Sequence, residues 1–446
     1  MKKTSLKEKD KQFVWHPFTQ MKDWQDEEQL VITKGKGVYL WDEHGNKYID
    51  GVSSLWVNLH GHKHPHIDDA LKRQVDKLAH STLLGLANDV SVELAEKLIK
   101  IAPRGLTKVF YSDNGSTAME IAVKMAYQYW QQYGEVESRK SQVVSKAKIS
   151  NPKKKTKFVS LKNAYHGDTI GSVSVGGIDL FHRIFKPLLF QVQHVDNIEK
   201  LETLLKKQSG SIAGIVAEPL VQGAAGMQIW PDGFIKKVRE LCDKYDVLMI
   251  CDEVATGFGR TGTMFACEQE AVVPDIMAIA KGLTAGYLPL AATLTKEKIY
   301  QNFLGSHESQ RTFFHGHTYT GNPLGCAVAL ANLEIFEKEQ TLQKLQEKIK
   351  FLAEELQRFN DLEHVGDIRQ KGFMVGIELF QDAINKKAYA YKERVGHKVI
   401  MEARKQGVLI RPLGDTIILM PPLSISKEEL KKLLDTVHSS IKKVTE

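Results

Sequence analysis

The chain has 446 residues, of which 42% are hydrophobic and 26% charged, an ordinary composition for a soluble globular protein. This length exceeds what one hydrophobic core usually serves, so we expect one large domain and one or two smaller ones. No apolar run approaches the roughly 20 residues of a membrane helix, and no apolar segment follows the basic N-terminus as in a secretory signal. We therefore expect a cytoplasmic protein without a membrane partner.

Much of the net charge of +7 lies in a lysine-rich stretch, residues 138–157. Such a run is compatible with nucleic-acid binding, but no aromatic residues are interleaved for base stacking, so we favour a solvated surface loop and expect no nucleic-acid partner. Four cysteines lie in or beside apolar segments without C-x-x-C spacing, which indicates buried thiols in a reducing compartment. They are Cys242, Cys251, Cys267 and Cys326.

In chain order, residues 30–50 alternate apolar and polar positions around a His-Gly-Asn turn, which predicts a small hairpin. Helical periodicity begins at about residue 66. Strand-like and helical segments then alternate, with strands expected at KVFYS, KFVSL, IAGIVAE, VLMICDE and IMAIA. Beyond about residue 325 the pattern predicts one long helix over residues 326–357, then short strands and a last helix. Alternation of this kind favours an α/β fold with a mainly parallel sheet covered on both faces.

Ligands of open α/β sheets bind at the carboxyl ends of the strands. Polar residues gather at these expected ends, namely Ser112–Ser116, Tyr165–Asp168, Glu218, Asp252 with Glu253, and Lys281. One neighbouring motif, GFGRTG at residues 257–262, matches the G-x-G-x-x-G pattern of a dinucleotide-binding loop. That loop joins its strand directly to its helix, whereas residues 252–256 intervene here and the expected second half does not follow. We therefore do not interpret these glycines as a dinucleotide site.

Asp252 ends an almost wholly apolar strand, where a carboxylate is costly unless it meets a cation. One interpretation is a helix N-cap or a salt bridge, for example with Arg260. The other is a partner for the protonated ring nitrogen of pyridoxal phosphate, a role that an aspartate fills in enzymes with this cofactor. The second interpretation requires a lysine that bonds to the cofactor aldehyde, and a site for its phosphate.

Both requirements have candidates. Lys281 lies among apolar and small residues, which favour a neutral amine that is nucleophilic toward an aldehyde. A lysine that extends to the surface is the alternative. Residues 113–117 lie between an expected strand and an expected helix, where backbone N–H groups at the helix N-terminus bind anions. A simple helix cap would use the same residues. The three features in this order are more specific than any one of them.

The stretches DEVATGFGRTG, AKGLTAGYLPLA and HGHTYTGNPLGCAVA resemble the class-III, fold-type I pyridoxal-phosphate aminotransferases. WHPFTQM, GVSSLWVNLHGHKHP, YHGDTIGSVSVGG and RPLGD are similar to the branch that aminates 8-amino-7-oxononanoate in biotin biosynthesis. The resemblance covers nearly the whole chain apart from the lysine-rich stretch. It implies a large cofactor-binding domain over residues 66–325, a smaller α+β domain built from residues 1–65 and 326–446, and a homodimer with shared active sites.

The resemblance also implies residue roles. Lys281 would hold pyridoxal phosphate covalently, Asp252 would pair with its ring nitrogen, and Tyr165 would lie on its ring. Gly115 and Ser116 would bind the phosphate, and the neighbouring subunit would reach the same region with Gly316, His317 and Thr318. Arg411 would clamp the far carboxylate of the substrate bidentately, with a surface salt bridge as the alternative. The implied substrate contacts are Phe18, Leu55, Trp56, Tyr165, Asp168, Lys281, Gly316 and Arg411.

The amino donor is less settled than the acceptor. Members that use S-adenosylmethionine carry a tyrosine, a second tryptophan and another tyrosine where this chain has Phe18, Leu55 and Ile418. Each change removes a hydroxyl or an aromatic face from the donor pocket, and some relatives use lysine instead. S-Adenosylmethionine, the usual donor of the branch, stays our expectation, with lysine as the alternative.

Two other interpretations are weighed. The stretch HGHKHPH would put His60, His62, His64 and His66 on one face of a strand, as in a metal-dependent hydrolase, although no motif such as H-E-x-x-H accompanies them. We expect no metal site, so this is a remote alternative. A class-III enzyme for ornithine, 4-aminobutyrate or another ω-amine is the nearer one, and Phe18, Tyr165 and Arg411 argue against it.

Overall fold

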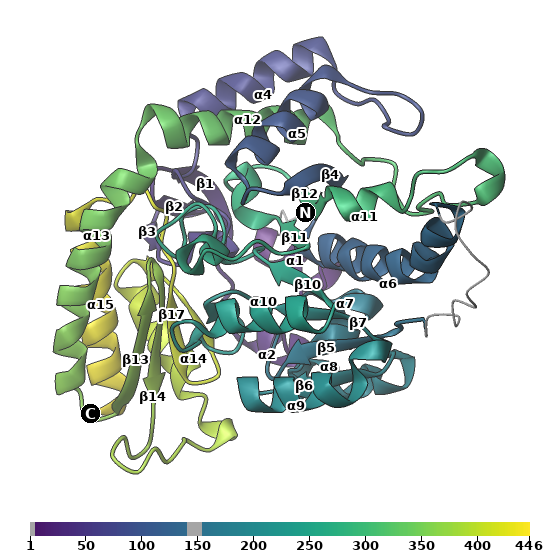
Figure 1. Ribbon diagram of the computed structural model, residues 1–446. Helices are drawn as coiled ribbons and strands as arrows, with labels where there is room; N and C mark the ends of the chain where they lie inside the picture. The colour runs from purple at the N-terminus through teal and green to yellow at the C-terminus, as the bar shows by residue number, and fades with distance from the viewer. Residues whose placement is uncertain (1–4, 141–153) are drawn as a thin grey trace.

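A sheet of seven strands organises the part of the chain that the computed structural model describes, residues 5–140 and 154–446 (Figure 1). Six strands point the same way, and only β12 runs antiparallel to both of its neighbours, β11 and β4. In spatial order the strands are β4 (Leu106–Ser112), β12 (Ala291–Lys296), β11 (Ile276–Ile279), β10 (Leu248–Asp252), β7 (Ile212–Ala217), β5 (Lys157–Leu161) and β6 (Val192–Val195). The predicted α/β fold with a mainly parallel sheet is confirmed.

Helices cover both faces of this sheet because its strands are apolar on both sides. Successive side chains of a strand point to opposite faces. In β10, Leu248 and Ile250 pack with helix α6 (Gly115–Lys140), whereas Met249 and Cys251 belong to the other core, which contains α9 (Ile198–Gln208) and α10 (Phe234–Lys244). The buried sheet edge that carries the polar residues is therefore held between two packed layers.

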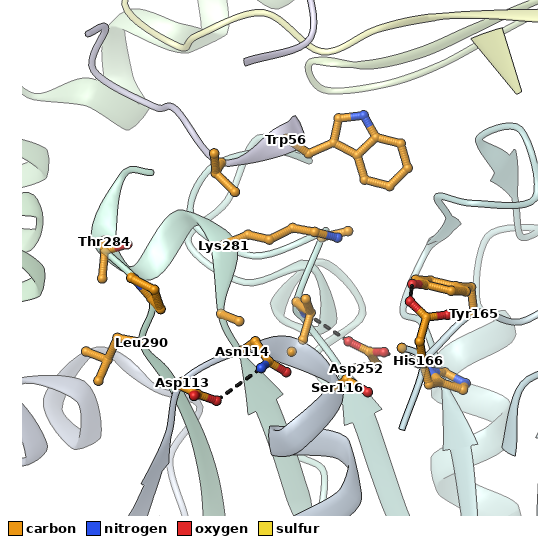
Figure 2. Close-up of a pocket in the computed structure, with 18 of the residues that line it drawn as sticks. Trp56, Asp113, Asn114, Ser116, Tyr165, His166, Asp252, Lys281, Thr284 and Leu290 are labelled. Atoms are coloured by element: carbon orange, nitrogen blue, oxygen red, sulfur yellow. Dashed lines mark hydrogen bonds and ion pairs between the residues drawn. The ribbon is translucent and has the colours of Figure 1, made fainter. Parts of the chain in front are cut away.

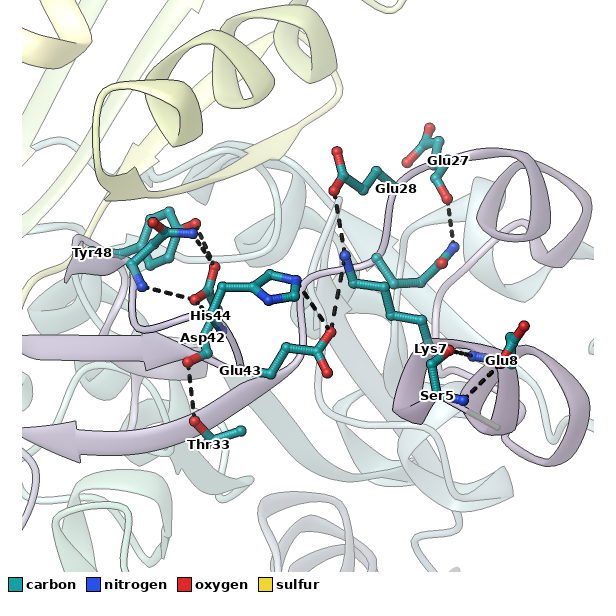
Figure 3. A network of polar contacts seen from close by, with 12 residues as sticks. Ser5, Lys7, Glu8, Glu27, Glu28, Thr33, Asp42, Glu43, His44 and Tyr48 are labelled. Atoms are coloured by element: carbon teal, nitrogen blue, oxygen red, sulfur yellow. Dashed lines mark hydrogen bonds and ion pairs between the residues drawn. The ribbon is translucent and has the colours of Figure 1, made fainter. Parts of the chain in front are cut away.

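The N-terminal strands form a second, four-stranded sheet, and a strand from the far end of the sequence completes it. Its order is β1 (Ile32–Lys36), β2 (Tyr39–Asp42), β3 (Lys47–Asp50) and β15 (Val408–Leu409). The predicted hairpin is confirmed, with the turn between β2 and β3. Asp42, the last residue of β2, accepts hydrogen bonds from Asn46, Tyr48 and His44 around this turn (Figure 3). Burial raises the pKa of the Asp42 carboxyl group, but these hydrogen bonds outweigh burial and lower that pKa to about 2.

The C-terminal part adds a four-stranded antiparallel sheet and three helices, which lie together in Figure 1. The strands are β13 (Val365–Lys371), β14 (Met374–Leu379), β17 (Thr416–Leu419) and β16 (Arg411–Leu413); the helices are α13 (Thr341–Leu356), α14 (Val395–Lys405) and α15 (Lys427–Thr445). Since β15 pairs with β3, the two ends of the sequence meet in one sheet. The division of the chain into domains at residues 65 and 325 stays a prediction.

The prediction of one long helix over residues 326–357 is wrong. The segment forms two helices, α12 (Pro323–Lys338) and α13, because Gln340 adopts a left-handed conformation with φ of 53° that ends the first helix. α12 then packs with α4 (Pro65–Lys77) and α5 (Asp89–Ile101), whereas α13 packs with α15. Apolar periodicity continued across the break, so the sequence pattern alone did not reveal it.

The remaining described α-helices and strands are short. They are α1 (Leu6–Phe13), α2 (Met21–Asp26), α3 (Ser53–Trp56), α7 (Ile170–Val175), α8 (Asp179–His182), α11 (Glu297–Gln301), β8 (Val221–Gln222) and β9 (Gln228–Ile229). The four cysteines are buried free thiols, as predicted. Within the described ranges, no helix is both long and apolar enough to cross a membrane. Residues 141–153, most of the lysine-rich stretch that we interpreted as a surface loop, lie outside the described residues.

Candidate active site

A cavity of about 810 Å³ lies at the carboxyl ends of the central strands. Strand ends at this edge contribute polar side chains from β4, β5, β7 and β10, and Lys281 follows β11. Seven of the residues implicated by the sequence line this one cavity: Trp56, Gly115, Ser116, Tyr165, Asp168, Asp252 and Lys281. Segments separated by more than 200 residues of sequence thus meet at the edge where α/β proteins bind their ligands.

Lys281 extends across the cavity toward the Trp56 ring, whose centroid lies 4.9 Å from its Nζ atom (Figure 2). Its backbone is left-handed, with φ of 44°, a strained conformation for a non-glycine residue that is common at functional sites. Burial lowers the pKa of the Lys281 ammonium, although Asp252 and Glu218 oppose that shift. A lowered pKa favours the neutral, nucleophilic amine.

Asp252, at the end of β10, is buried and accepts two hydrogen bonds. The Val254 amide donates to Oδ1 at 3.0 Å, and the His166 ring donates from Nδ1 to Oδ2 at 2.7 Å. His166 is itself buried. Among the described residues Arg260 forms no hydrogen bond or ion pair with Asp252, so Arg260 is not the salt-bridge partner of this carboxylate, and His166 lies in that place. The guanidinium of Arg260 donates instead to the carbonyls of Asn58 and Pro421.

The N-terminus of α6 forms one corner of the cavity. The Asn114 side chain caps the Thr117 amide at 3.0 Å, so the helix-cap interpretation is correct. The preceding amides, those of Gly115 and Ser116, have no intrahelical partner because they lie in the first turn. A Cβ atom at Gly115 would come within 2.5 Å of Val254, so only glycine fits this approach. Gly115 and Ser116 both line the cavity.

Tyr165 and Asp168 form a polar pair in the part of the wall next to Ser116, whose hydroxyl accepts a hydrogen bond from the Thr169 amide at 2.9 Å. The Tyr165 hydroxyl donates to Asp168 Oδ2 at 2.6 Å (Figure 2). Burial, followed by this hydrogen bond, raises the pKa of the Tyr165 phenol. Arg411 is half-buried and close enough to influence that phenol, although it is not among the described residues that line the cavity. Burial lowers the pKa of Arg411, and no described carboxylate forms an ion pair with it, so the surface salt bridge is not supported.

The other expected substrate contacts are more distant. The Phe18 ring lies 5.5 Å from that of Phe181, which lies 6.2 Å from the Tyr165 ring, so Phe18 reaches the cavity through an intermediate aromatic residue. Leu55 and Phe18 are both exposed, and neither is among the described residues of the cavity wall. Ile418 is fully buried in the core, so this side chain packs with apolar neighbours and does not face a donor pocket.

The segment expected to act in a neighbouring subunit lies apart from the cavity of its own chain. Gly316 and Thr318 are exposed, His317 is half-buried, and none of them is a described lining residue. The His317 amide donates to the Thr320 hydroxyl at 3.1 Å, which shapes a local turn. Phe314, beside them, is 79% exposed.

Two motifs of the sequence have other roles than the rival interpretations give them. The glycines of GFGRTG form a turn in which the Phe258 amide donates to the Met264 carbonyl at 2.6 Å, in keeping with the rejection of a dinucleotide loop. The four histidines do not lie on a strand, and each has a different partner: Asn332, Asp50, Glu339 and Glu334 for His60, His62, His64 and His66, respectively. Among the described residues no group of three metal ligands exists.

Two buried residues of the cavity were not assigned roles from the sequence. His166 contacts Asp252, and Glu218, at the end of β7, accepts hydrogen bonds from the Tyr165 and Gly223 amides at 3.2 and 3.0 Å. Burial, reinforced by Asp252 and opposed by His166, raises the pKa of Glu218 to about 7. In the sequence both residues lie at or just after the end of an expected strand, and this position is the signal that points to a place in the ligand cavity.

Comparison with known proteins agrees with this geometry. The family model described as aminotransferase class-III matches residues 20–441. A relative from Geobacter sulfurreducens, named adenosylmethionine-8-amino-7-oxononanoate aminotransferase, is 51% identical over 99% of this chain and 98% of its own. A relative of the same name from Aquifex aeolicus is 50% identical over 99% and 98% of the two chains.

Solved structures agree as well. The crystal structure of adenosylmethionine-8-amino-7-oxononanoate aminotransferase from Methanocaldococcus jannaschii superimposes with a TM-score of 0.93 at 47% identity, covering 98% of each chain. An omega transaminase from Pseudomonas jessenii, solved in complex with PMP, has a TM-score of 0.90 at 31% identity, covering 99% of this chain and 98% of its own.

Proposed function

Since the chain belongs to the class-III aminotransferases, we propose that it transfers an amino group from S-adenosylmethionine to 8-amino-7-oxononanoate with pyridoxal phosphate as cofactor. The observation that carries this proposal is the convergence of Lys281, Asp252 and the N-terminus of α6 on one cavity. The names of the relatives near 50% identity supply the substrate and the donor.

The residues of the cavity fit the cofactor. Lys281 offers a buried amine for the aldehyde, Asp252 a buried carboxylate for the ring nitrogen, and the amides of Gly115 and Ser116 donors for the phosphate. Because Gly115 has no Cβ atom, it can lie close to Val254, and no side chain at this position covers the corner that would receive the anion. When bound, pyridoxal phosphate supplies an aldehyde that receives the amino group and a protonated ring that accepts negative charge.

Proton transfer is assigned to Lys281. Its Nζ, with a lowered pKa, would accept the proton from the α-carbon of the donor and pass it to the cofactor within the first half of the reaction, and the second half would run the same transfer in reverse toward the acceptor. The hydrogen bond from His166 holds the Asp252 carboxylate in place. Negative charge at Asp252 thereby stabilises a protonated nitrogen next to it.

Recognition of the acceptor is assigned to Arg411, Tyr165, Asp168 and Phe18. The Arg411 guanidinium, without an ion pair among the described residues, is available for the far carboxylate of 8-amino-7-oxononanoate. The Tyr165–Asp168 pair supplies polar groups in the cavity wall, close enough to this arginine to be influenced by its charge. Phe18, next to Phe181, adds an apolar surface for the alkyl chain.

The homodimer with shared active sites is also part of the proposal. It is supported by the exposure of Gly316, Thr318 and Phe314 on a segment that does not contribute to the cavity of its own chain. In the proposed dimer, the backbone and the hydroxyl of this segment complete the phosphate site of the opposite subunit.

The donor is tested on purified protein loaded with pyridoxal phosphate. Either S-adenosylmethionine or lysine is added alone, and loss of the cofactor absorbance is followed, with Lys281→Ala as the control that abolishes conversion. We expect S-adenosylmethionine to convert the protein, and diaminononanoate to form once 8-amino-7-oxononanoate is supplied. Conversion by lysine alone would show that lysine, and not S-adenosylmethionine, is the amino donor. Conversion only by ornithine or 4-aminobutyrate would contradict the proposed amination of 8-amino-7-oxononanoate.

A further inference from the structure

A short segment of the cavity wall has a strained backbone. We call residues 53–56 the wall segment; it is helix α3, which follows strand β3. Ser53, Ser54 and Trp56 have φ angles of 52°, 62° and 65°, in the left-handed region that favours glycine. Left-handed non-glycine residues persist only where the surrounding structure holds them in place, and they gather at functional sites. The contacts that hold this segment are therefore expected to matter for the function of the cavity.

A carboxylate holds the middle of the wall segment. Asp50, the last residue of β3, is 1% exposed. Its Oδ1 accepts a hydrogen bond from the Ser54 amide at 2.8 Å, and its Oδ2 accepts one from the Ser54 hydroxyl at 3.1 Å. Hydrogen bonds to a buried carboxylate are stronger than those between neutral groups. Asp50 thus fixes the residue with the least favourable backbone conformation.

His62 in turn holds the carboxylate. Its Nε2 lies 2.9 Å from Asp50 Oδ2, and because a carboxylate only accepts, the imidazole donates. The ring of His62 packs against Gly35, where a Cβ atom would come within 2.9 Å of it. Of the four histidines in the HGHKHPH stretch, His62 is the one that pairs with the carboxylate holding the wall segment.

The two flanks of the wall segment are tied to the C-terminal part of the chain. The Ser53 hydroxyl donates to the Met420 carbonyl at 2.7 Å. Beyond the segment, Arg260 donates to the carbonyls of Asn58 and Pro421 at 2.9 and 2.6 Å. With both flanks attached, Ser54 and its neighbours are the part whose conformation depends on Asp50.

The wall segment ends with Trp56, which faces the reactive lysine. Its ring lies 4.9 Å from Lys281 Nζ (Figure 2). On another side a Cβ atom at Gly223 would come within 3.2 Å of the same ring, so the indole fits closely between two parts of the wall. A change in the backbone at residues 53–56 would displace this ring from the cavity.

We propose that Asp50 and His62 are positioning residues that hold the wall segment in its strained conformation and so keep Trp56 in place for acceptor binding. The kinetic part of this inference rests on the proposed function. If only a fraction of molecules has the wall segment in its binding conformation, the apparent affinity for the acceptor falls by that fraction. The rate of the chemical step changes less than the apparent affinity, because it is carried out only by molecules whose wall segment is in the binding conformation.

The first test needs no substrate. Hydrogen–deuterium exchange is measured on peptides that cover residues 51–58 in the cofactor-loaded protein and in its Asp50→Ala, His62→Ala and His62→Gln variants. We expect about tenfold faster exchange of the Ser54 amide region in the two alanine variants, as for the loss of one buried hydrogen bond to a charged group. His62→Gln keeps a donor and should restore most of the protection.

His66→Ala is the matched control, because His66 also pairs with a carboxylate, that of Glu334 at 2.8 Å, but outside the cavity wall. Its exchange at residues 51–58 should equal that of the wild type. Unchanged exchange in His62→Ala and in a folded Asp50→Ala protein overturns the inference. Equal acceleration in His66→Ala does so too, because it would show a general loosening. His62→Ala, at a half-buried side chain, keeps the test valid if Asp50→Ala does not fold.

The second test separates KM from kcat. For His62→Ala we expect the KM for 8-amino-7-oxononanoate to rise about tenfold while kcat stays within about twofold, with restoration in His62→Gln. Faster exchange with an unchanged KM would overturn the role in acceptor binding. If the wild-type protein does not aminate this acceptor with any donor, the proposed function fails, and the exchange experiment alone decides whether Asp50 and His62 hold the wall segment.

Discussion

Three ionisable residues interact at the carboxyl ends of neighbouring strands, and their positions explain the electrostatics of the cavity. Glu218 is fully enclosed, and burial together with Asp252 raises its pKa to about 7, while His166 acts in the opposite direction. His166 thus interacts with both carboxylates. Its contact with Asp252 is the more direct of the two, because a 2.7 Å hydrogen bond joins them.

Replacement of His166 should therefore impair catalysis and leave the fold intact. In His166→Ala, Asp252 loses a charge-assisted hydrogen bond, so we expect kcat to fall by about tenfold or more and the cofactor to dissociate faster on dialysis. His166→Asn, which keeps a donor near the Nδ1 position, should recover part of the activity. His194→Ala, on the edge strand β6, is the control. Wild-type kcat and cofactor retention in His166→Ala would refute the role.

At the scale of secondary-structure elements, the break between α12 and α13 directs two helices to different partners. α12 packs with α4 and α5, and α13 packs with α15. The break is made by Gln340, a non-glycine residue in the left-handed region, where glycine has no steric penalty. The same backbone requirement makes this position suitable for a stability test.

Gln340→Gly should stabilise the protein slightly, by up to about 1 kcal/mol, because it removes the contact of Cβ with the following carbonyl. The matched control is Gln343→Gly, at an exposed position inside α13. There, glycine should destabilise by about 1 kcal/mol relative to a good helix former. Thermal unfolding midpoints of the two variants should shift in opposite directions. A lower midpoint for Gln340→Gly would show that its side chain contributes contacts that outweigh the backbone strain.

At the scale of the whole molecule, the proposed dimer can be tested by mixing inactive subunits. Lys281→Ala lacks the lysine, and Thr318→Ala lacks the hydroxyl that the partner subunit is proposed to supply. In a heterodimer of these variants, one site combines an intact Lys281 with an intact Thr318 from the other chain. We therefore expect unfolding and refolding of the mixture to recover activity well above that of either variant alone.

The control for this experiment is a mixture of Lys281→Ala with Asp252→Ala, two residues that line the same cavity of one chain. Because each chain supplies both Lys281 and Asp252 to its own cavity, one site of this heterodimer lacks the lysine and the other lacks the aspartate. Neither site is intact, so this mixture should regain no activity. A mixture with Thr318→Ala that also regains nothing would indicate that Thr318 acts within its own chain or not at all.

Local pattern in the sequence was sufficient for the central sheet and for the order of the polar strand ends. Lys281, Asp252, Gly115 and Ser116 were found because each stands beside a strongly apolar strand or at the start of a helix, and the structure brings them to one cavity. The break at Gln340 was missed because its apolar periodicity continues into the next helix.

The α/β fold class, the family and the residues that end the strands follow from the sequence alone, because helix and strand periodicities and the family motifs are local properties of the chain. Which distant groups meet depends on the three-dimensional fold. The pairing of β15 with β3, the contact of His166 with Asp252 and the hold of Asp50 and His62 on the wall segment all depend on it. These contacts arise from the order of strands in the sheets, which places residues far apart in the sequence within hydrogen-bonding distance.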